Sequence, residues 1–216
     1  FAQPPMLYTI EVNGQPEDRL AAGTKAGVFY SINPDNGEII WQRQVGPGGV
    51  IGGMEFGSAT DGNRIYLQNS NFDHIPYVLE AGAHAGEEIV SGFWAALDAT
   101  TGELLWQTPV PGYQAPLDGP IVHLAWGGGK GEGFFKWPLG PPTIANGVVF
   151  AGVSDLEGTM VAMDAATGEI LWQYESGASV VASPSVVDGR LYWGSGYAYG
   201  TDGKQILSFG LAGDER

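Results

Sequence analysis

The sequence predicts an all-β fold in which four-stranded antiparallel sheets repeat along the chain as the blades of a β-propeller. A turn followed by an apolar strand recurs, and each copy ends in tryptophan; the copies are residues 33–41, 98–106 and 164–172. The tryptophans are 65 and 66 residues apart, and a near-constant period is the signature of a repeat architecture. Asp-Gly or Asn-Gly pairs, which are typical of β-hairpins, stand at 61–62, 146–147 and 188–189.

The sequence therefore predicts two hairpins, and so four strands, in each repeat. Apolar and small residues alternate before the repeated turn, as expected for a strand. In the turn, an Asp or Asn side chain can bond backbone amides two residues on, and the glycine needs a positive φ; these glycines are Gly37, Gly102 and Gly168. Each tryptophan is predicted to lie between neighbouring sheets and to bury about 200 Å². This role is structural and needs no catalytic function of the indole.

The predicted blades cover residues 6–45, 49–108, 141–175 and 180–211, and the last stops after its third strand. The chain thus holds about 3.75 blades, and we expect it to be part of a ring of seven or eight blades. Residues 1–5 are too short and proline-rich to supply the missing strand. The remaining blades would then lie on the same chain or on another. The alternative is a small four-blade ring with an open seam.

Composition excludes several classes of protein. Gly is 35 and Pro 14, but hydrophobic residues make up 44%, which favours short strands and turns over disorder. The formal charge of −15 repels phosphate backbones, so nucleic acid is not an expected partner. No cysteine is present, which excludes disulfides, thiolate metal sites and a haem attachment motif in these residues. No apolar run reaches 18 residues, so no membrane-spanning helix is expected.

The pattern A-x-D-x-x-x-G-E-x-x-W, found at 96–106 and 162–172 with Ser31 and Asn33 substituted in the first copy, supports a more specific interpretation. It resembles the tryptophan-docking repeat of quinoprotein β-propellers, which include the pyrroloquinoline quinone (PQQ) dehydrogenases and non-enzymatic relatives. A narrower resemblance is to the C-terminal part of the polyvinyl alcohol dehydrogenase-like group, carried by residues 52–62, 92–98 and 193–197.

The resemblance implies a PQQ-dependent oxidation of an alcohol or polyol, with electrons passed to an external acceptor such as a cytochrome. It also implies calcium beside the quinone and a location in the bacterial periplasm or outside the cell. Members of the group often carry a haem c domain, whereas this chain has no haem motif. Related dehydrogenases tend to have tryptophan after the residue that matches Glu55, and this chain has Phe56.

Two insertions, residues 69–91 and 109–141, interrupt the repeat. In a four-stranded meander both belong to the same rim, as does the glycine-rich passage 46–56 between the first two blades. Long loops on a rigid scaffold are where binding residues concentrate. This rim is therefore the predicted functional face.

The first insertion offers oxygen ligands for calcium, of which we select Asn69 and Asp73. The alternative is an ordinary turn, which has the same composition. His74 and His84 are ten residues apart and match no zinc spacing.

The second insertion combines aromatic residues with a glycine run, which suggests a flap over a flat ligand or a neighbouring subunit. A planar quinone needs an aromatic face and cations for its carboxylates, so the candidate cofactor-binding residues are Trp126, Lys130, Lys136 and Trp137. The alternative is that these aromatic residues merely anchor the loop to the propeller.

The passage between the first two blades adds three candidates. Gly52 and Gly53 would allow the backbone to approach a ligand closely, and Glu55 would place a carboxylate near the axis. Glu55, and Asp118 of the second insertion, are the candidate bases for an alcohol proton. Whether the chain is enzymatic stays open, because a non-catalytic scaffold, or a structural subunit of a larger complex, would keep the same tryptophans.

Overall fold

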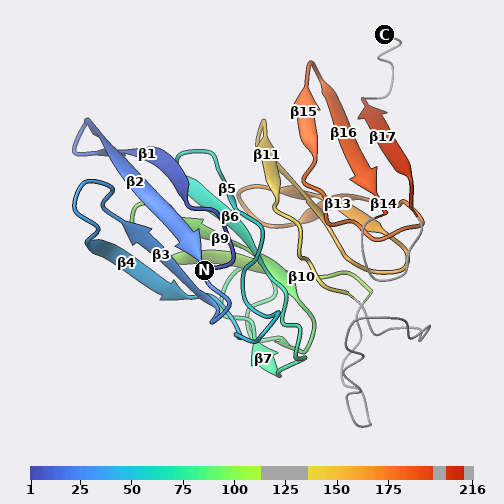
Figure 1. Ribbon diagram of the computed structural model, residues 1–216, viewed down its shortest axis with the longest axis horizontal. Helices are drawn as coiled ribbons and strands as arrows, with labels where there is room; N and C mark the ends of the chain where they lie inside the picture. Colours follow the sequence, from blue (N-terminus) through green and yellow to red (C-terminus); the bar gives the residue numbers. More distant parts are fainter. Residues whose placement is uncertain (113–135, 197–202, 212–216) are drawn as a thin grey trace.

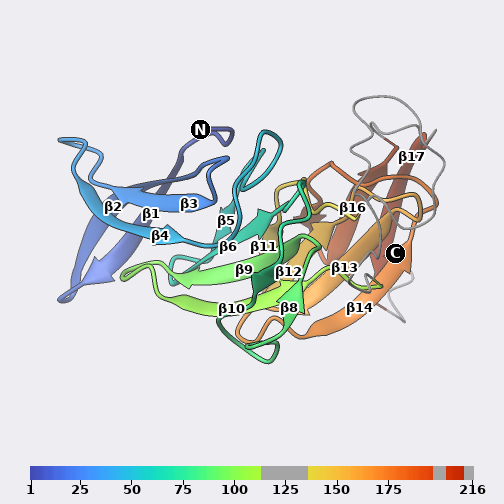
Figure 2. The same cartoon turned by 90° about the horizontal axis from the view of Figure 1, so that it is seen from below.

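The computed structural model describes residues 1–112, 136–196 and 203–211, and these residues form β-strands and no helix (Figure 1). Consequently, no helix in the described ranges is available to cross a membrane. Four main sheets follow one another along the chain, and the first and last lie at opposite ends of the molecule in both ribbon views (Figures 1 and 2). The predicted all-β partial propeller is confirmed.

The first sheet is a meander of four antiparallel strands in chain order. Its hairpin at Asn13 and Gly14 has φ values of 53° and 75°, the left-handed backbone that a two-residue hairpin turn requires. The strands are β1 (Met6–Val12), β2 (Gln15–Gly23), β3 (Val28–Ile32) and β4 (Ile39–Gln44).

The second sheet has the same antiparallel order but is interrupted by the first insertion. The insertion forms a separate two-stranded hairpin between the second and third strands of the sheet. The sheet consists of β5 (Ala59–Thr60), β6 (Arg64–Asn69), β9 (Phe93–Asp98) and β10 (Leu104–Pro109), and the extra hairpin of β7 (Tyr77–Val78) and β8 (Glu88–Ile89).

The third sheet repeats the four-stranded meander, and the fourth shows three strands within the described residues. The third contains β11 (Thr143–Ala145), β12 (Val148–Gly152), β13 (Thr159–Asp164) and β14 (Ile170–Glu175). The fourth contains β15 (Ser185–Val187), β16 (Arg190–Ser195) and β17 (Gln205–Gly210).

The hydrophobic core is divided into layers, each between two consecutive sheets. Phe29 of the first sheet and Leu97 of the second belong to one layer, and Trp94 of the second sheet and Met163 of the third belong to the next. A smaller layer around Trp193 joins the third and fourth sheets. Because each sheet buries both faces only when it has a neighbour on both sides, this arrangement is that of propeller blades.

The repeated tryptophans lie at these junctions, as predicted. Trp41 packs on the turn of the second sheet at Gly102, and Trp106 packs on the turn of the third sheet at Gly168. The indole nitrogen of Trp106 also donates a hydrogen bond to the Ala165 carbonyl over 3.1 Å. Each tryptophan is thus a contact from one sheet to the next.

The connections that carry the candidate residues meet along one rim. The passage 45–58 contacts the β2–β3 loop through Gly49 N and Lys25 O, and it contacts Ser70 after β6 through Gly53 O. Trp137 O accepts a hydrogen bond from Ser154 N of the β12–β13 loop. Within the described residues, these hydrogen bonds join the passage 45–58 to the first and second blades, and join Trp137 to the third blade.

Candidate functional site

A buried carboxylate lies on this rim, in the passage between the first two blades. Glu55 is 6% exposed, and its Oε1 lies 2.9 Å from the Nζ of Lys25. Lys25 comes from the β2–β3 loop and also donates a hydrogen bond to the Val50 carbonyl over 2.8 Å. The ion pair therefore fastens the passage between two blades to the first blade and compensates the charge of the buried carboxylate.

Gly52 and Gly53, the candidate positions for close approach of a ligand, let the backbone of this chain pack closely on itself. A Cβ at Gly52 would lie 2.6 Å from the Gly49 nitrogen, and one at Gly53 would lie 2.5 Å from the Thr24 carbonyl oxygen. Gly53 also has a φ of 71°, which favours glycine. The space that their side chains would fill belongs to this chain.

Phe56 follows Glu55 in an unusual backbone conformation. Its φ is 63°, in the left-handed region where a bulky residue is a strained exception. Its side chain is 49% exposed, and its amide donates a hydrogen bond to the Ala2 carbonyl over 3.0 Å. An exposed aromatic ring therefore stands next in sequence to the buried carboxylate, and strain of this kind clusters at functional sites.

Gln68 is a site residue that the sequence analysis missed. It is fully buried on β6, and its Nε2 donates hydrogen bonds to the carbonyls of Glu55 and, over 2.9 Å, of Leu139. It therefore ties together the two passages that lead into and out of the second blade. The only signal in the sequence was a polar residue where the strand pattern predicts a buried one.

Asn69 and Asp73, the candidate calcium ligands, both lie close to the same passage. Asn69 is fully buried; its Nδ2 donates to the Pro47 carbonyl over 3.0 Å, and its Oδ1 accepts the Asn71 amide over 3.0 Å. A Cβ at Gly49 would lie 2.3 Å from the Oδ2 of Asp73. The described ranges contain no group of three His, Asp or Glu residues that could hold a metal ion. These residues alone do not fit calcium, which takes six to eight oxygen ligands.

Lys136 and Trp137 also reach this rim. The Nζ of Lys136 lies 3.4 Å from the Oδ2 of Asp155 and 3.8 Å from the Oε2 of Glu157. Trp137 is 4% exposed, and its ring centroid lies 4.2 Å from that of Phe72. Both side chains therefore contact this chain's own groups, as in the alternative in which the aromatic residues anchor the loop. Three further candidates, Asp118, Trp126 and Lys130, lie outside the described residues.

The first insertion clamps the second sheet to the first. The Tyr77 hydroxyl lies 3.0 Å from the Val45 carbonyl and 2.6 Å from the Oε1 of Glu80, and Glu80 pairs with Arg43 of β4 at 2.6 Å. The Tyr77 ring stacks on Phe93 at a centroid distance of 5.6 Å. Burial, and then the hydrogen bond to Glu80, raise the pKa of Tyr77 to about 12.

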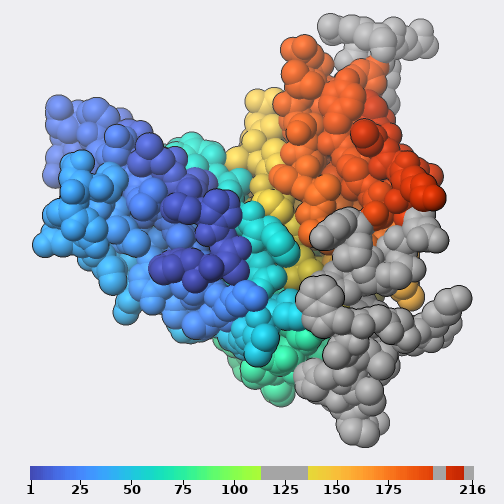
Figure 3. Space-filling model, viewed as in Figure 1, coloured from blue at the N-terminus to red at the C-terminus, as the bar shows by residue number. Residues whose placement is uncertain are grey.

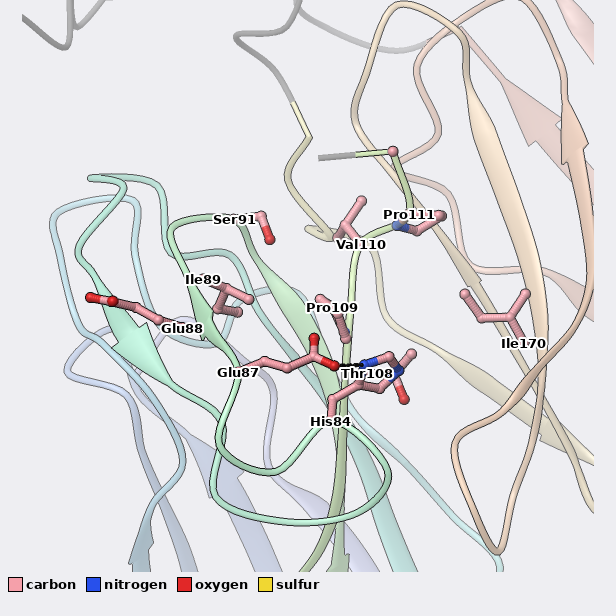
Figure 4. A pocket seen from close by; sticks show the side chains of 11 residues that line it. His84, Glu87, Glu88, Ile89, Ser91, Thr108, Pro109, Val110, Pro111 and Ile170 are labelled. Carbon is pink, nitrogen blue, oxygen red and sulfur yellow. Dashed lines mark hydrogen bonds and ion pairs between the residues drawn. The ribbon is translucent and has the colours of Figure 1, made fainter. Parts of the chain in front are cut away.

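A pocket of about 400 Å³ lies between this insertion and the outer strands, away from Glu55. Its walls include Ile89 and Val110, with Ile170 of the third sheet opposite them (Figure 4). The Nδ1 of His84 and the Oε1 of Glu87 are within hydrogen-bond distance, at 3.0 Å, along one side (Figure 4). Apart from His84, none of the residues singled out in the sequence analysis lines it.

Comparison with known proteins completes the assignment of the fold. A family model for PQQ-type repeats, described as outer membrane protein assembly factor BamB, matches residues 90–209, more than half of the chain. The chain belongs to the PQQ-type β-propeller repeat family.

Several relatives within this family are dehydrogenases. The polyvinylalcohol dehydrogenase of Sphingopyxis sp. strain 113P3 is 30% identical over 90% of this chain and 30% of its own length. The quinohemoprotein alcohol dehydrogenase of Comamonas testosteroni is 39% identical over 90% of this chain and 33% of its own length. This chain thus spans about a third of the length of the curated relatives it matches.

A solved structure shares the fold. The quinohemoprotein alcohol dehydrogenase ADHIIG of Pseudomonas putida HK5 superimposes with a TM-score of 0.52 at 15% identity, over 91% of this chain and 34% of that structure. At this identity the likeness concerns the fold alone. The chain therefore corresponds to a section of a propeller in proteins of this family.

Proposed function

We propose that this chain is part of a PQQ-dependent dehydrogenase that oxidises an alcohol or polyol and passes the electrons to an external acceptor such as a cytochrome. The similarity to a polyvinylalcohol dehydrogenase and a quinohemoprotein alcohol dehydrogenase along 90% of the chain supports the reaction class. One observation supports a role for particular residues in this reaction: the buried Glu55 is paired with Lys25 and is followed by the strained, exposed Phe56.

In this proposal Glu55 accepts the hydroxyl proton of the alcohol. PQQ, when bound, supplies the two-electron acceptor. A base must lie within hydrogen-bond reach of the proton that it takes, and the carboxylate of Glu55 is held in place by Lys25 at 2.9 Å. Phe56 offers an exposed apolar ring for the carbon chain of the substrate. Asp118 remains the second candidate base.

The residues proposed to hold the cofactors form only part of each binding site. Asn69 and Asp73 would contribute to a calcium site only together with further oxygen ligands, since calcium takes six to eight. Trp126 and Lys130 are the residues proposed to stack on the quinone and pair with its carboxylates, because Trp137 and Lys136 already contact Phe72 and Asp155. The role given to Glu55 does not depend on calcium.

The test uses the full-length protein supplied with PQQ and calcium, with dye reduction by alcohols as the measure of turnover. Glu55→Gln should lower kcat by about 100-fold or more while the protein stays folded and retains bound quinone. Glu87→Gln is the matched control, because Glu87 lies beside His84 in a pocket that Glu55 does not line. Full activity of Glu55→Gln would exclude Glu55 as the base, and a lack of both bound quinone and turnover would exclude the dehydrogenase.

We also propose, on the same resemblance, that the protein is located in the periplasm or outside the cell. Fractionation of the source cells tests this: the full-length protein should be released with periplasmic contents or found in the medium. Recovery only from the cytoplasm would contradict the location.

A non-catalytic propeller, acting as a scaffold or as a binding subunit of a larger complex, is the second candidate. It is favoured by the internal contacts of Lys136, Trp137 and Asn69 and by a family model described after an assembly factor. Under this alternative, the full-length protein would bind no PQQ, and alcohols would cause no dye reduction. Isolation of the protein in a stable complex would then support the scaffold.

A further inference from the structure

A tight turn of three residues carries Glu55 and Phe56. The Gly57 amide donates a hydrogen bond over 2.8 Å to the carbonyl of Glu55, two residues earlier, and Phe56 between them has a φ of 63°. A hydrogen bond across two residues with a positive φ at the central one is the pattern of the classic γ-turn, which is rare and strained. A bulky residue keeps such a conformation only where the surrounding structure holds it.

Two buried glutamines from different parts of the chain hold this turn. Gln68 of β6 donates through its Nε2 to the Glu55 carbonyl, which therefore accepts two hydrogen bonds. Gln3 is 6% exposed, and its Nε2 donates to the Gly57 carbonyl over 3.1 Å. The first and the last carbonyl of the turn are thus each fixed by a buried side-chain amide.

The Gln3 side chain has one orientation that satisfies its contacts. Its Oε1 accepts the Gly23 amide at the end of β2 over 2.9 Å and the Ser58 hydroxyl over 3.1 Å. Because a backbone amide can only donate, the Oε1 must face Gly23, and the Nε2 is left to face the Gly57 carbonyl. Gln3 therefore connects the end of β2 in the first sheet to the residues that follow Phe56.

The N-terminal segment, residues 1–5, brings Gln3 to this place. Its residues are the darkest blue in Figure 3 and lie on the face of the molecule that this view shows, next to the first two sheets. The Phe56 amide donates to the Ala2 carbonyl over 3.0 Å, so the backbone of the segment holds the same turn that Gln3 holds through its side chain. In this turn the Glu55 carboxylate is buried and the Phe56 ring is half exposed.

We propose that Gln3 is a positioning residue, which keeps the Glu55–Phe56–Gly57 turn in its strained conformation and so fixes where the carboxylate and the ring lie. The catalytic consequence rests on the proposed function, whereas the holding of the turn does not. Without the Gln3 amide the Gly57 carbonyl loses its donor, and Phe56 can relax to a negative φ, which moves the backbone on both sides of it. A displacement of about 1 Å at a reacting group can cost about 100-fold in rate.

Hydrogen exchange of the full-length protein tests whether Gln3 holds the turn. Gln3→Met keeps the length of the side chain and removes its amide, so the two hydrogen-bonded amides of the turn should exchange at least about tenfold faster than in the wild type. Gln107→Met is the matched control and should leave them unchanged. Gln107 is also fully buried, and it bonds the Glu80 amide and the Val45 carbonyl, which lie outside the turn. Unchanged exchange in Gln3→Met would overturn the proposal.

Kinetics tests the catalytic consequence. Gln3→Met should lower kcat by about tenfold or more, whereas Gln107→Met should leave kcat unchanged. In the Glu55→Gln background, Gln3→Met should have little further effect, because no base is left to be positioned. An equal loss in both backgrounds would show a merely structural role and overturn the positioning of Glu55. If the wild type itself shows no turnover, the proposed function fails, and the exchange result alone decides whether Gln3 holds the turn.

A third measurement decides the matter if Gln3→Met does not fold. Glycine adopts a positive φ without strain, so Phe56→Gly should raise the Tm of the full-length protein by about 2 °C. Val50→Gly is the control, because Val50 is an exposed apolar residue of the same passage and lacks a positive φ; its Tm should fall. A fall of the same size in Phe56→Gly would show that the turn is not strained, and the proposal would then be wrong.

Discussion

The indole of Trp106 occupies the space above Gly168, where a Cβ would lie 2.6 Å from its Cε3. Its nitrogen donates a hydrogen bond to Ala165 of the same turn. At the preceding junction, Trp41 covers Gly102 in the same way, but the carbonyl of Ala99 accepts its hydrogen bond from the hydroxyl of Tyr8. Both junctions therefore have an indole packed on a glycine turn. They differ in the donor of the hydrogen bond to the turn carbonyl, which is the indole nitrogen of Trp106 at one junction and the Tyr8 hydroxyl at the other.

Trp106→Phe should destabilise the protein more than Trp41→Phe. Both variants lose part of the indole contact, but only Trp106→Phe leaves the Ala165 carbonyl without its donor. Trp106 is also 1% exposed, whereas Trp41 is only partly buried. We expect a loss of about 2 kcal/mol of unfolding free energy for Trp106→Phe and about 1 kcal/mol for Trp41→Phe. Urea unfolding measures both, and equal losses would contradict this account of the junctions.

Tyr8→Phe should destabilise the first junction. The Tyr8 hydroxyl, buried between the first two sheets, lies 3.0 Å from both the Ala99 carbonyl and the hydroxyl of Ser31. Its removal leaves two buried polar groups without a partner, which costs about 1–3 kcal/mol. Ser31→Ala restores the alanine of the other repeats, so Ser31→Ala in the Tyr8→Phe background should recover part of the loss. If the two changes are additive in urea unfolding, the hydroxyls do not act as a unit.

The sequence predicted the fold well because its determinants are local and repeated. Gly37, Gly102 and Gly168 all have the positive φ that the turn composition required, and each tryptophan follows its glycine at a fixed distance in the sequence. The indoles of Trp41 and Trp106 each lie on the same turn one repeat further on, and Trp172 packs on Phe209 of the fourth sheet. A period in the sequence was therefore enough to predict that these tryptophans lie between neighbouring sheets.

The rim was predicted less completely because its contacts are not periodic. Lys25 and Glu55 meet only when the β2–β3 loop folds against the passage between blades, and nothing in the sequence marks Lys25 as the partner. The sequence marked Asn69 and Asp73 of the first insertion as candidate metal ligands, with an ordinary turn as the alternative, but it did not indicate that Tyr77 and Glu80 contact Val45 and Arg43. Such pairings give loop residues a role in holding the sheets together. The amino-acid composition of a loop does not predict which residues will pair.

Alkaline pH should weaken the clamp that Tyr77 makes. Its pKa is raised to about 12 in the folded protein, from a usual value of 10.0, so the fold favours the neutral hydroxyl. The resulting stability is fully present below pH 10 and is lost as the pH rises through 12. Tyr77→Phe lacks this contribution at every pH. The difference in urea midpoint between wild type and Tyr77→Phe should therefore shrink between pH 10 and pH 12, and a constant difference would exclude ionisation of Tyr77 as the cause.

Lys25→Met should reveal how far the fold depends on the charge of Glu55. The variant leaves a carboxylate with an 8% exposed side chain without its cation, and we expect a loss of about 1–3 kcal/mol. This lies below the usual 3–5 kcal/mol for a broken buried pair because 46% of the Lys25 side chain is exposed to water.

The decisive comparison for this pair is the double variant. Lys25→Met combined with Glu55→Gln should be less destabilised than the sum of the single variants, since neither charge is then left alone. Arg64→Met is the control, because its pair with Asp61 is longer, at 3.7 Å, and about a third exposed, so its loss should stay within about 1 kcal/mol. If the two rim substitutions add independently, Lys25 does not hold the Glu55 carboxylate, and the position of the proposed base would have to be explained by the backbone of the passage alone.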